Sequence, residues 1–380
     1  MRRGTALLTA FLLVLCLLCP QAPAEKAITL TFAGDCTFGS EEIAKNNTDS
    51  FESCVKQNGY DYFFANYYDL FSQDDCTVVN CECVFSDSRD YEVTSKSFRF
   101  RAAEDYVNIF KAGSVEAVSL ANNHTMDYSE QGLINTKRVL DEAGIGWAWD
   151  ECVWVYKKDG IGIGFAAIDY GIYQRSNYLV RDRLLQLRKD GEINAAVLLV
   201  HQGNEYSPWH IPEQDLYAEY FIENAQVDLV ITSHPHVLQG IRILDNRTVF
   251  YSLGNFIFGG HNRVSKGNGT DSLYTMAVQA KLYFTDDGEY EGQQVTLYPG
   301  YDSGQDPVNN YQPVRVNAEQ AEAVLNAIQQ DTEWQLPEIR TDANGLSYVV
   351  LDYLPADRNA PAQRTNGEPE PAAPKPDRNR

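Results

Sequence analysis

The stretch DLVITSHPHVLQG (228–240) joins an apolar run to two histidines. Its residues 229–231 are typical of a buried strand, and His234 and His236 follow shortly after that strand. Histidines in this position are either packing residues of a core or loop, or ligands of a shared metal ion. Alternate residues of an extended segment point to the same side, and Pro235 biases His234 towards extended backbone. The spacing therefore allows both side chains to reach one metal, and the rest of the chain decides between the two interpretations.

Outward from this stretch, apolar runs alternate with helical or turn-rich segments, which indicates an α/β fold. The runs expected to be strands are 28–35, 77–83, 116–124, 161–170, 195–203, 228–236 and 248–256. Residues 132–144 and 213–225 have the periodicity of helices. Beyond about residue 269, the alternating runs 274–284 and 290–299 indicate antiparallel strands that complete a second sheet. A helix over 318–330 and a strand over 347–354 are expected to follow.

The two ends of the chain differ from this folded part. Arg2 and Arg3 precede an apolar run over 6–19 and Ala-Pro-Ala at 22–24, which is the pattern of a secretory signal peptide over 1–24. An uncleaved anchor is the alternative, but the run is shorter than the ~20 residues that cross a bilayer comfortably. Residues 355–380 are rich in Pro, Asn and charge, so we expect a disordered tail.

The expected organisation is therefore a leader, one folded domain over 25–354 and a tail. Within the domain, the motifs lie in 28–259 and the C-terminal strands and helix in 270–354. The leader implies an exported protein, either extracellular or associated with the cell envelope.

The formal net charge is −22, and it becomes −24 without the leader, because residues 1–24 contain two arginines and no acid. This large negative charge argues against nucleic acid and against anionic membrane surfaces as partners. Contact with a membrane is then expected only if the leader stays attached.

Six cysteines follow the leader, and in an exported protein they can form up to three disulfides. They are Cys36, Cys54, Cys76, Cys81, Cys83 and Cys152. The Cys81/Cys83 pair resembles a short metal motif, but no second pair has the spacing of a zinc ribbon. Disulfides or buried thiols are therefore favoured.

Residues able to bind a metal stand where the apolar runs end. In chain order they are Asp35, Asn80 with Glu82, Asn122 to His124, His201, and His234 with His236. Each has a structural explanation when taken alone: a turn, a helix cap, a polar loop or a packed histidine. However, ligands of open α/β sheets collect at the carboxyl ends of strands, and four of the six histidines fall there. Histidine, carboxylate and amide oxygen together favour one or two ions of manganese, zinc or iron. His210 and His261 are expected to be packing residues.

The order of these motifs resembles that of the bacterial CapA family, whose members are associated with synthesis and export of poly-γ-glutamate capsules. The family is similar to the calcineurin-like metallophosphoesterases, so the resemblance implies a two-sheet β-sandwich flanked by helices, in four layers α/β/β/α. It covers about residues 28–259. The motifs that carry it are GD at 34–35, N-x-E at 80–82, NNHTMDY at 122–128, HQGNEY at 201–206, SHPHVLQ at 233–239 and YSLGNFIF at 251–258.

The resemblance also implies roles for individual residues. The expected metal ligands are Asp35, Glu82, Asn123, His201, His234 and His236. His124 matches a histidine that acts as general acid or stabilises transition-state charge, and Asp127 is its expected orienting partner. The residues expected to support the ligands or contact substrate are Asn80, Asn122, Glu205 and Asn255.

Two departures from the superfamily pattern affect this assignment. Thr37 stands where the related enzymes usually carry a metal-binding histidine, and the segment NCEC (80–83) replaces the motif with the bridging Asp. One metal site therefore loses an imidazole, and it is weaker, absent or differently ligated.

Two functions fit these features. The first is a metal-dependent hydrolase or transferase acting on a phosphoester or a γ-glutamyl polymer. The second is a non-catalytic, metal-stabilised component that binds polymer or partners during capsule assembly. The expected partners are a polyanionic polymer or small phosphoester and the capsule-synthesis proteins of the envelope, and nucleic acid is not expected.

Overall fold

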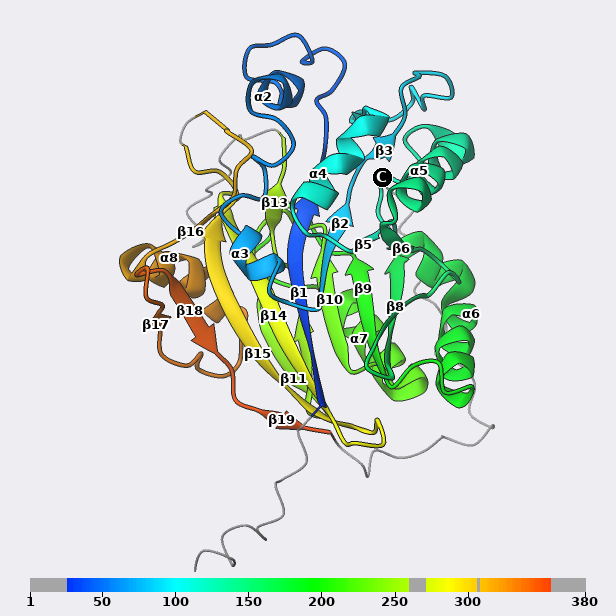
Figure 1. Cartoon of the computed structure of the whole chain (residues 1–380), viewed down its shortest axis with the longest axis vertical. Coiled ribbons are helices and arrows are strands. Elements are labelled where there is room, and N and C mark those ends of the chain that lie inside the picture. The colour runs from blue at the N-terminus through cyan, green and yellow to red at the C-terminus, as the bar shows by residue number, and fades with distance from the viewer. Residues whose placement is uncertain (1–25, 260–270, 306–307, 357–380) are drawn as a thin grey trace, which may run out of the picture.

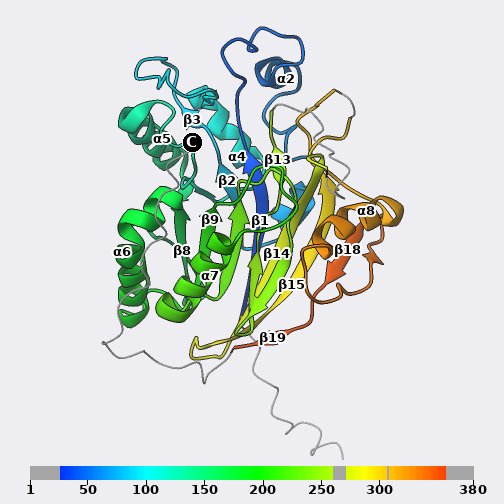
Figure 2. The same ribbon diagram turned by 180° about the vertical axis from the view of Figure 1, so that it is seen from behind.

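The computed structural model describes residues 26–259, 271–305 and 308–356. The predicted leader, His261 and the predicted tail beyond residue 356 lie outside the described residues. Two sheets pack against each other with helices on both outer sides (Figures 1 and 2), so the predicted four-layer α/β/β/α sandwich is confirmed.

The larger sheet contains the N-terminal strand and most C-terminal strands. Its main order is β17 (Arg340–Thr341), β18 (Ser347–Val350), β15 (Tyr290–Tyr301), β14 (Tyr274–Phe284), β1 (Lys26–Cys36), β2 (Cys76–Cys81), β5 (Ala117–Ser119) and β6 (Gly146–Ala148). Beside this path, β13 (Asn255–Ile257) pairs with β1, and both β16 (Val314–Arg315) and β19 (Leu354–Pro355) pair with β15. The predicted antiparallel pair is present as β14 and β15, but its assignment to the second sheet is wrong. The pair extends the first sheet because β14 runs antiparallel to β1.

The smaller sheet is built from the middle of the chain. Its order is β11 (Ile241–Leu244), β12 (Arg247–Phe250), β10 (Leu229–Ser233), β9 (Ala195–His201), β8 (Ile161–Asp169) and β7 (Trp154–Lys158). The predicted strand over 248–256 is split between β12 in this sheet and β13 in the other. A separate two-stranded ribbon pairs β3 (Val84–Phe85) with β4 (Arg101–Ala102).

Helices cover the outer face of each sheet. On the side of the first sheet these are α3 (Tyr68–Phe71), the 3₁₀ turn η1 (Glu104–Val107), α4 (Asn108–Ala112) and α5 (Ser129–Ala143). Helix α2 (Phe51–Asn58) belongs to the same core but lies beyond the strand ends in Figure 1. On the second sheet they are α6 (Tyr170–Lys189) and α7 (Pro212–Ala225), while α8 (Ala318–Gln329) packs on β15. Asp169 caps α6, since its carboxylate accepts a hydrogen bond from the backbone N–H of Ile172 at 2.7 Å. Among the described residues, no helix is both long and apolar enough to cross a membrane.

Strand β1 contributes to two cores because its side chains alternate between the faces of the sheet. Leu30 and Phe32 belong to the core between the sheets, where Phe32 lies 6.5 Å from the ring of Phe165. Ala33 and Cys36 belong to the core under the outer helices. Each fully buried phenylalanine contributes roughly 1.5–3 kcal/mol of hydrophobic stabilisation. The strand that carries Asp35 is therefore fixed from both sides.

The pairing registers bring the ends of distant strands together. Asp35 lies opposite Asn80 of β2 on one side and Asn255 of β13 on the other. In the second sheet, Ser233 at the end of β10 lies opposite His201 at the end of β9. These parallel registers place the carboxyl ends of four strands at one end of the sandwich.

The six described cysteines are all free thiols, so the structure supports the thiol interpretation over disulfides. Four of them are buried, namely Cys36, Cys76, Cys81 and Cys83. The sulfur atoms of Cys81 and Cys83 are in contact at 4.0 Å.

Candidate metal centre

A buried group of two carboxylates and one imidazole lies at the ends of β1, β2 and β9. Asp35 and Glu82 have no solvent-exposed surface, and His201 is 4% exposed. His201 Nδ1 lies 3.9 Å from Asp35 Oδ1, and His201 Nε2 lies 3.6 Å from Glu82 Oε1. Ligand atoms of the three residues lie within 4.8 Å of one another, which is close enough for one metal ion to contact all three. The structure thus brings together three of the predicted ligands.

Asn123 and His234 complete the surroundings of the His201 ring. Asn123 Oδ1 lies 2.9 Å from His201 Nε2, and His234 Nδ1 lies 3.1 Å from the same nitrogen. Glu82 Oε1 is also near His201 Nε2. Two oxygens, those of Asn123 and Glu82, and one further imidazole nitrogen, that of His234, therefore surround His201 Nε2.

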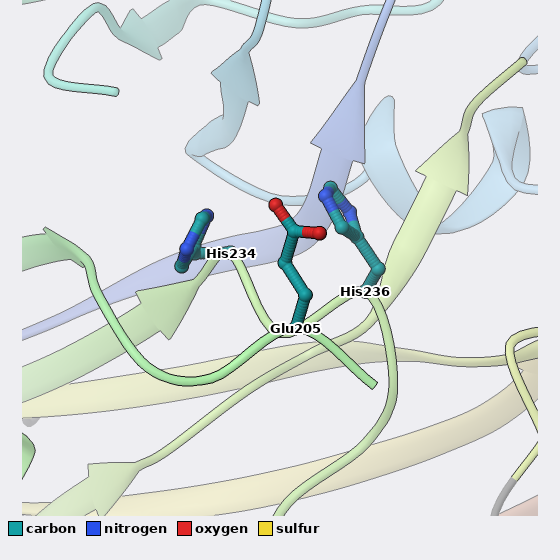
Figure 3. A group of neighbouring side chains, drawn as sticks. All are labelled: Glu205, His234 and His236. Carbon is teal, nitrogen blue, oxygen red and sulfur yellow. The ribbon is translucent and has the colours of Figure 1, made fainter. Parts of the chain in front are cut away.

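His236 lies on the other side of Asp35. Its Nδ1 is 2.9 Å from Asn255 Oδ1 and 3.4 Å from Asp35 Oδ2. Figure 3 shows the carboxylate of Glu205 between the rings of His234 and His236, and ligand atoms of these three residues also lie within 4.8 Å of one another.

The prediction that His234 and His236 share one extended segment is wrong. Strand β10 ends at Ser233, and the chain then bends, with φ of 106° at His234 and 56° at His236. Positive φ is costly for residues other than glycine and is typical of functional sites. The two rings converge on Glu205 because of this bend rather than because of strand alternation.

Asn80 and Asn122 hold the ligands in place through their side-chain amides. Asn80 Nδ2 donates to Asp35 Oδ1 at 2.7 Å, and Asn122 Nδ2 donates to Asn80 Oδ1 at 3.1 Å and to the carbonyl of Cys81 at 2.8 Å. Both amides therefore lie next to Asp35 and the end of β2, and their supporting role stays a prediction.

His124 forms a pair with Asp127 beside the buried group. Its Nδ1 is 2.7 Å from Asp127 Oδ2, so its Nε2 faces Glu82 Oε1 at 3.8 Å. The backbone N–H of Phe100 donates to Asp127 Oδ2 at 2.8 Å, and Lys96 forms an ion pair with Asp127 Oδ1. Asp127 therefore keeps a fixed orientation, as a carboxylate that positions a histidine requires.

Three neighbours of the site were not predicted from the sequence. Lys96 and Phe100 come from the loop before β4, and the ring of Phe100 lies 4.4 Å from that of His124. The ring of Phe258 lies 4.6 Å from that of His236. No sequence signal singled out this loop, although YSLGNFIF contains Phe258.

Burial and mutual charge perturb the titration of the buried group. Burial opposes ionisation of Asp35, but its hydrogen bond with His236 and the charge of His201 lower its pKa to about 2. Burial, followed by the charge of Asp35, raises the pKa of Glu82 well above its usual value. Burial, followed by the neighbouring His234, lowers the pKa of His201 well below its usual value. The result is a neutral imidazole facing a carboxyl that lacks a compensating cation.

Three observations show that these residues fit a divalent metal. Glu82 Oε1 is buried and has no hydrogen-bond partner among the described residues. The ion-pair partners of Asp35 and Glu82 in the described part of the chain are histidines only. Histidine nitrogens with carboxylate and amide oxygens are ligands of zinc, manganese and iron. At the end of β1, Thr37 offers only a hydroxyl, which is buried without a hydrogen-bond partner among the described residues.

Taken together, the fold and the site define a two-sheet α/β protein with a candidate metal centre at its strand ends. The sequence profile described as "Bacterial capsule synthesis protein PGA_cap" matches residues 29–260. The match covers more than half of the chain, so the protein belongs to this family of bacterial capsule synthesis proteins, and the predicted membership is confirmed.

Two relatives carry names from the same process. The chain is 24% identical over 258 residues to "Capsule biosynthesis protein CapA" of Bacillus anthracis, which is 62% of this chain and 60% of that protein. It is 26% identical over 255 residues to "PGA biosynthesis protein CapA" of Bacillus subtilis (strain 168), which is 62% of this chain and 64% of that protein. The chain thus spans less than two thirds of the length of both relatives.

Two solved structures are similar at low sequence identity. One is a hypothetical protein from Thermus thermophilus, with a TM-score of 0.44, 12% identity, and coverage of 72% of this chain and 99% of that chain. The other is the calcineurin-like phosphoesterase YfkN from Bacillus subtilis, with a TM-score of 0.42, 12% identity, and coverage of 81% and 97%.

Proposed function

We propose that the protein is a metal-dependent hydrolase or transferase of capsule synthesis, acting on a phosphoester or a γ-glutamyl polymer. One observation carries this proposal. Metal-binding atoms of His201, Asn123 and Glu82 lie close together, and His124, which is oriented by the carboxylate of Asp127, lies beside them. A binding protein needs the first of these features but has no need of the second.

The residues that would hold the metal are Asp35, Glu82, Asn123, His201, His234 and His236. A divalent metal supplies Lewis acidity, which polarises a phosphoryl or carbonyl oxygen and makes a water molecule a better nucleophile. The contacts of these residues with one another support the ligand assignment.

His124 would give a proton to the leaving oxygen. Asp127 accepts at His124 Nδ1, which leaves the proton-carrying Nε2 facing the buried carboxylates when the ring is protonated. The rings of Phe100 and Phe258 pack on those of His124 and His236, so these two imidazoles are flanked by apolar surface. A general acid of this kind contributes about 10²- to 10⁴-fold to turnover.

Export and a polyanionic substrate are part of the proposal. The predicted leader and the capsule names of the relatives support action at the cell envelope, together with other capsule-synthesis proteins. A chain of net charge −22 repels a polyanion at long range, so a bound divalent metal would provide the local positive charge.

Turnover with and without metal tests this function. We expect the full-length chain to hydrolyse bis(p-nitrophenyl) phosphate or to cleave poly-γ-glutamate when manganese or zinc is present, and to stop when the metal is chelated. The measurements are nitrophenol release and polymer length. Bound metal without turnover of either compound would contradict catalysis and favour the non-catalytic binding role.

A further inference from the structure

We propose that a cavity at the outer edge of the larger sheet binds a neutral saccharide. The cavity has a volume of about 610 Å³, which is within the range of small-molecule sites. It is lined by the end of α5, by β6, by the turn before β7 and by one residue of α6, and Figure 1 shows both helices on the same side of the molecule as β6. None of these lining residues belongs to the metal centre, so the inference goes beyond the proposed function.

Two half-buried tryptophans give the cavity rigid aromatic walls. The indole of Trp154 lies directly against Gly146, where an added Cβ would stand 2.2 Å from Trp154 Cε2, and its ring lies 5.3 Å from that of Phe165 in the core. The indole N–H of Trp147 donates to Asp141 Oδ1 at 2.8 Å. Both rings therefore have fixed positions. The C–H groups of a sugar ring stack favourably on the electron-rich faces of such rings.

Three charged side chains at the cavity have hydrogen-bonding capacity that the protein does not use. Asp141 Oδ2, the carboxylate of Glu151 and the guanidinium of Arg183 have no hydrogen-bond or ion-pair partner among the described residues, and all three residues are exposed. A carboxylate accepts hydrogen bonds and a guanidinium donates them, whereas each hydroxyl of a sugar can do both. The cavity thus offers matching partners to neighbouring sugar hydroxyls.

The charge around the cavity favours a neutral ligand. The lining contains two carboxylates and one guanidinium, in a chain of net charge −22, so a polyanion such as poly-γ-glutamate is repelled. Lys137 disfavours a cationic ligand, because its ammonium lies 4.5 Å from the ring centre of Trp147 and 4.1 Å from that of Trp149. A neutral compound rich in hydroxyls suits both the aromatic rings and the unused polar groups.

Saccharide titrations of the full-length chain test this site. The probes are cellotriose, maltotriose and triacetylchitotriose, and binding is measured by calorimetry and by quenching of tryptophan fluorescence. We expect at least one probe to bind, and Arg183→Ala and Trp147→Leu to weaken its binding by about tenfold or more. Arg340→Ala and Trp209→Leu, which remove the same side chains from exposed positions outside the cavity, should bind as wild type does.

Several results would overturn the saccharide site. Wild type that binds none of the three probes at millimolar concentration would do so, as would cavity variants that bind as their controls do. Because Arg183 is exposed, its variant tests the site even if Trp147→Leu unfolds. Binding of poly-γ-glutamate alone, abolished in Arg183→Ala, would make the cavity a polyanion site instead. Chelation of divalent metal should leave saccharide binding unchanged, and its loss would place the saccharide at the metal centre.

Discussion

Substituting glutamine for His124 is expected to reduce turnover of an alkyl phosphodiester by about 10²- to 10⁴-fold while leaving the bound metal in place. The side chain of His124 is held by Asp127 at Nδ1, and its Nε2 stands 3.8 Å from Glu82 Oε1, beside the ligands rather than among them. Glutamine preserves polarity and approximate size but cannot deliver a proton. The measurements are initial rates and metal per chain.

The leaving group distinguishes proton donation from a structural role. An alkoxide needs a proton as it departs, whereas p-nitrophenolate is stable without one, so the loss should be much smaller for a p-nitrophenyl ester. Met126→Leu, at an exposed position of the same loop, should leave both rates unchanged. Equal losses for both substrates would contradict the role of His124 as an acid, and loss of metal would make it a ligand instead.

Substituting alanine for Gly34 is expected to destabilise the protein by about 3 kcal/mol. A Cβ at this position would stand 1.9 Å from the backbone carbonyl oxygen of Gly254, the residue just before β13, where β13 pairs with β1. The backbone N–H of Asp35 donates to the same carbonyl at 3.1 Å. The added methyl group therefore forces Asp35 and Asn255 apart, so metal affinity should fall with stability.

Urea unfolding of Gly34→Ala beside Gly171→Ala checks this expectation. An added Cβ at Gly171, near the start of α6, meets no atom closer than 3.4 Å, so this control should unfold within about 0.5 kcal/mol of wild type. A free energy of unfolding for Gly34→Ala as close to wild type as the control would contradict the close packing of β1 against β13.

The positions of the candidate site residues at or just after strand ends could be predicted from the sequence, because parallel strands of one sheet align their carboxyl ends. The ends of apolar runs, together with the family motifs, were enough to single out Asp35, His201 and Glu82. The assignment of 274–299 to the second sheet was wrong because alternation indicates a strand but not its neighbour. Pairing of β14 with β1 is a contact between residues about 250 positions apart.

The local geometry of the site was less predictable from the sequence than the identity of the residues that lie in it. Proline before His236 favoured extended backbone, yet the chain bends there because β10 has already ended at Ser233. Lys96 reaches Asp127 from a loop that has no periodicity, so only the folded chain reveals the contact. Glu205 was expected to support ligands or contact substrate, and its place between two imidazoles became visible only in three dimensions.

Metal content of the full-length chain tests the central claim most directly. After purification and dialysis without chelator, we expect wild type to retain at least one equivalent of manganese, zinc or iron per chain. The double variant Asp35→Asn/His201→Gln should retain almost none, because it removes a carboxylate charge and an imidazole from the buried group. His210→Gln, which changes a histidine bonded to Asp331 outside the site, should match wild type. A wild-type chain without metal, or a double variant with the metal content of wild type, would contradict a metal centre at these strand ends.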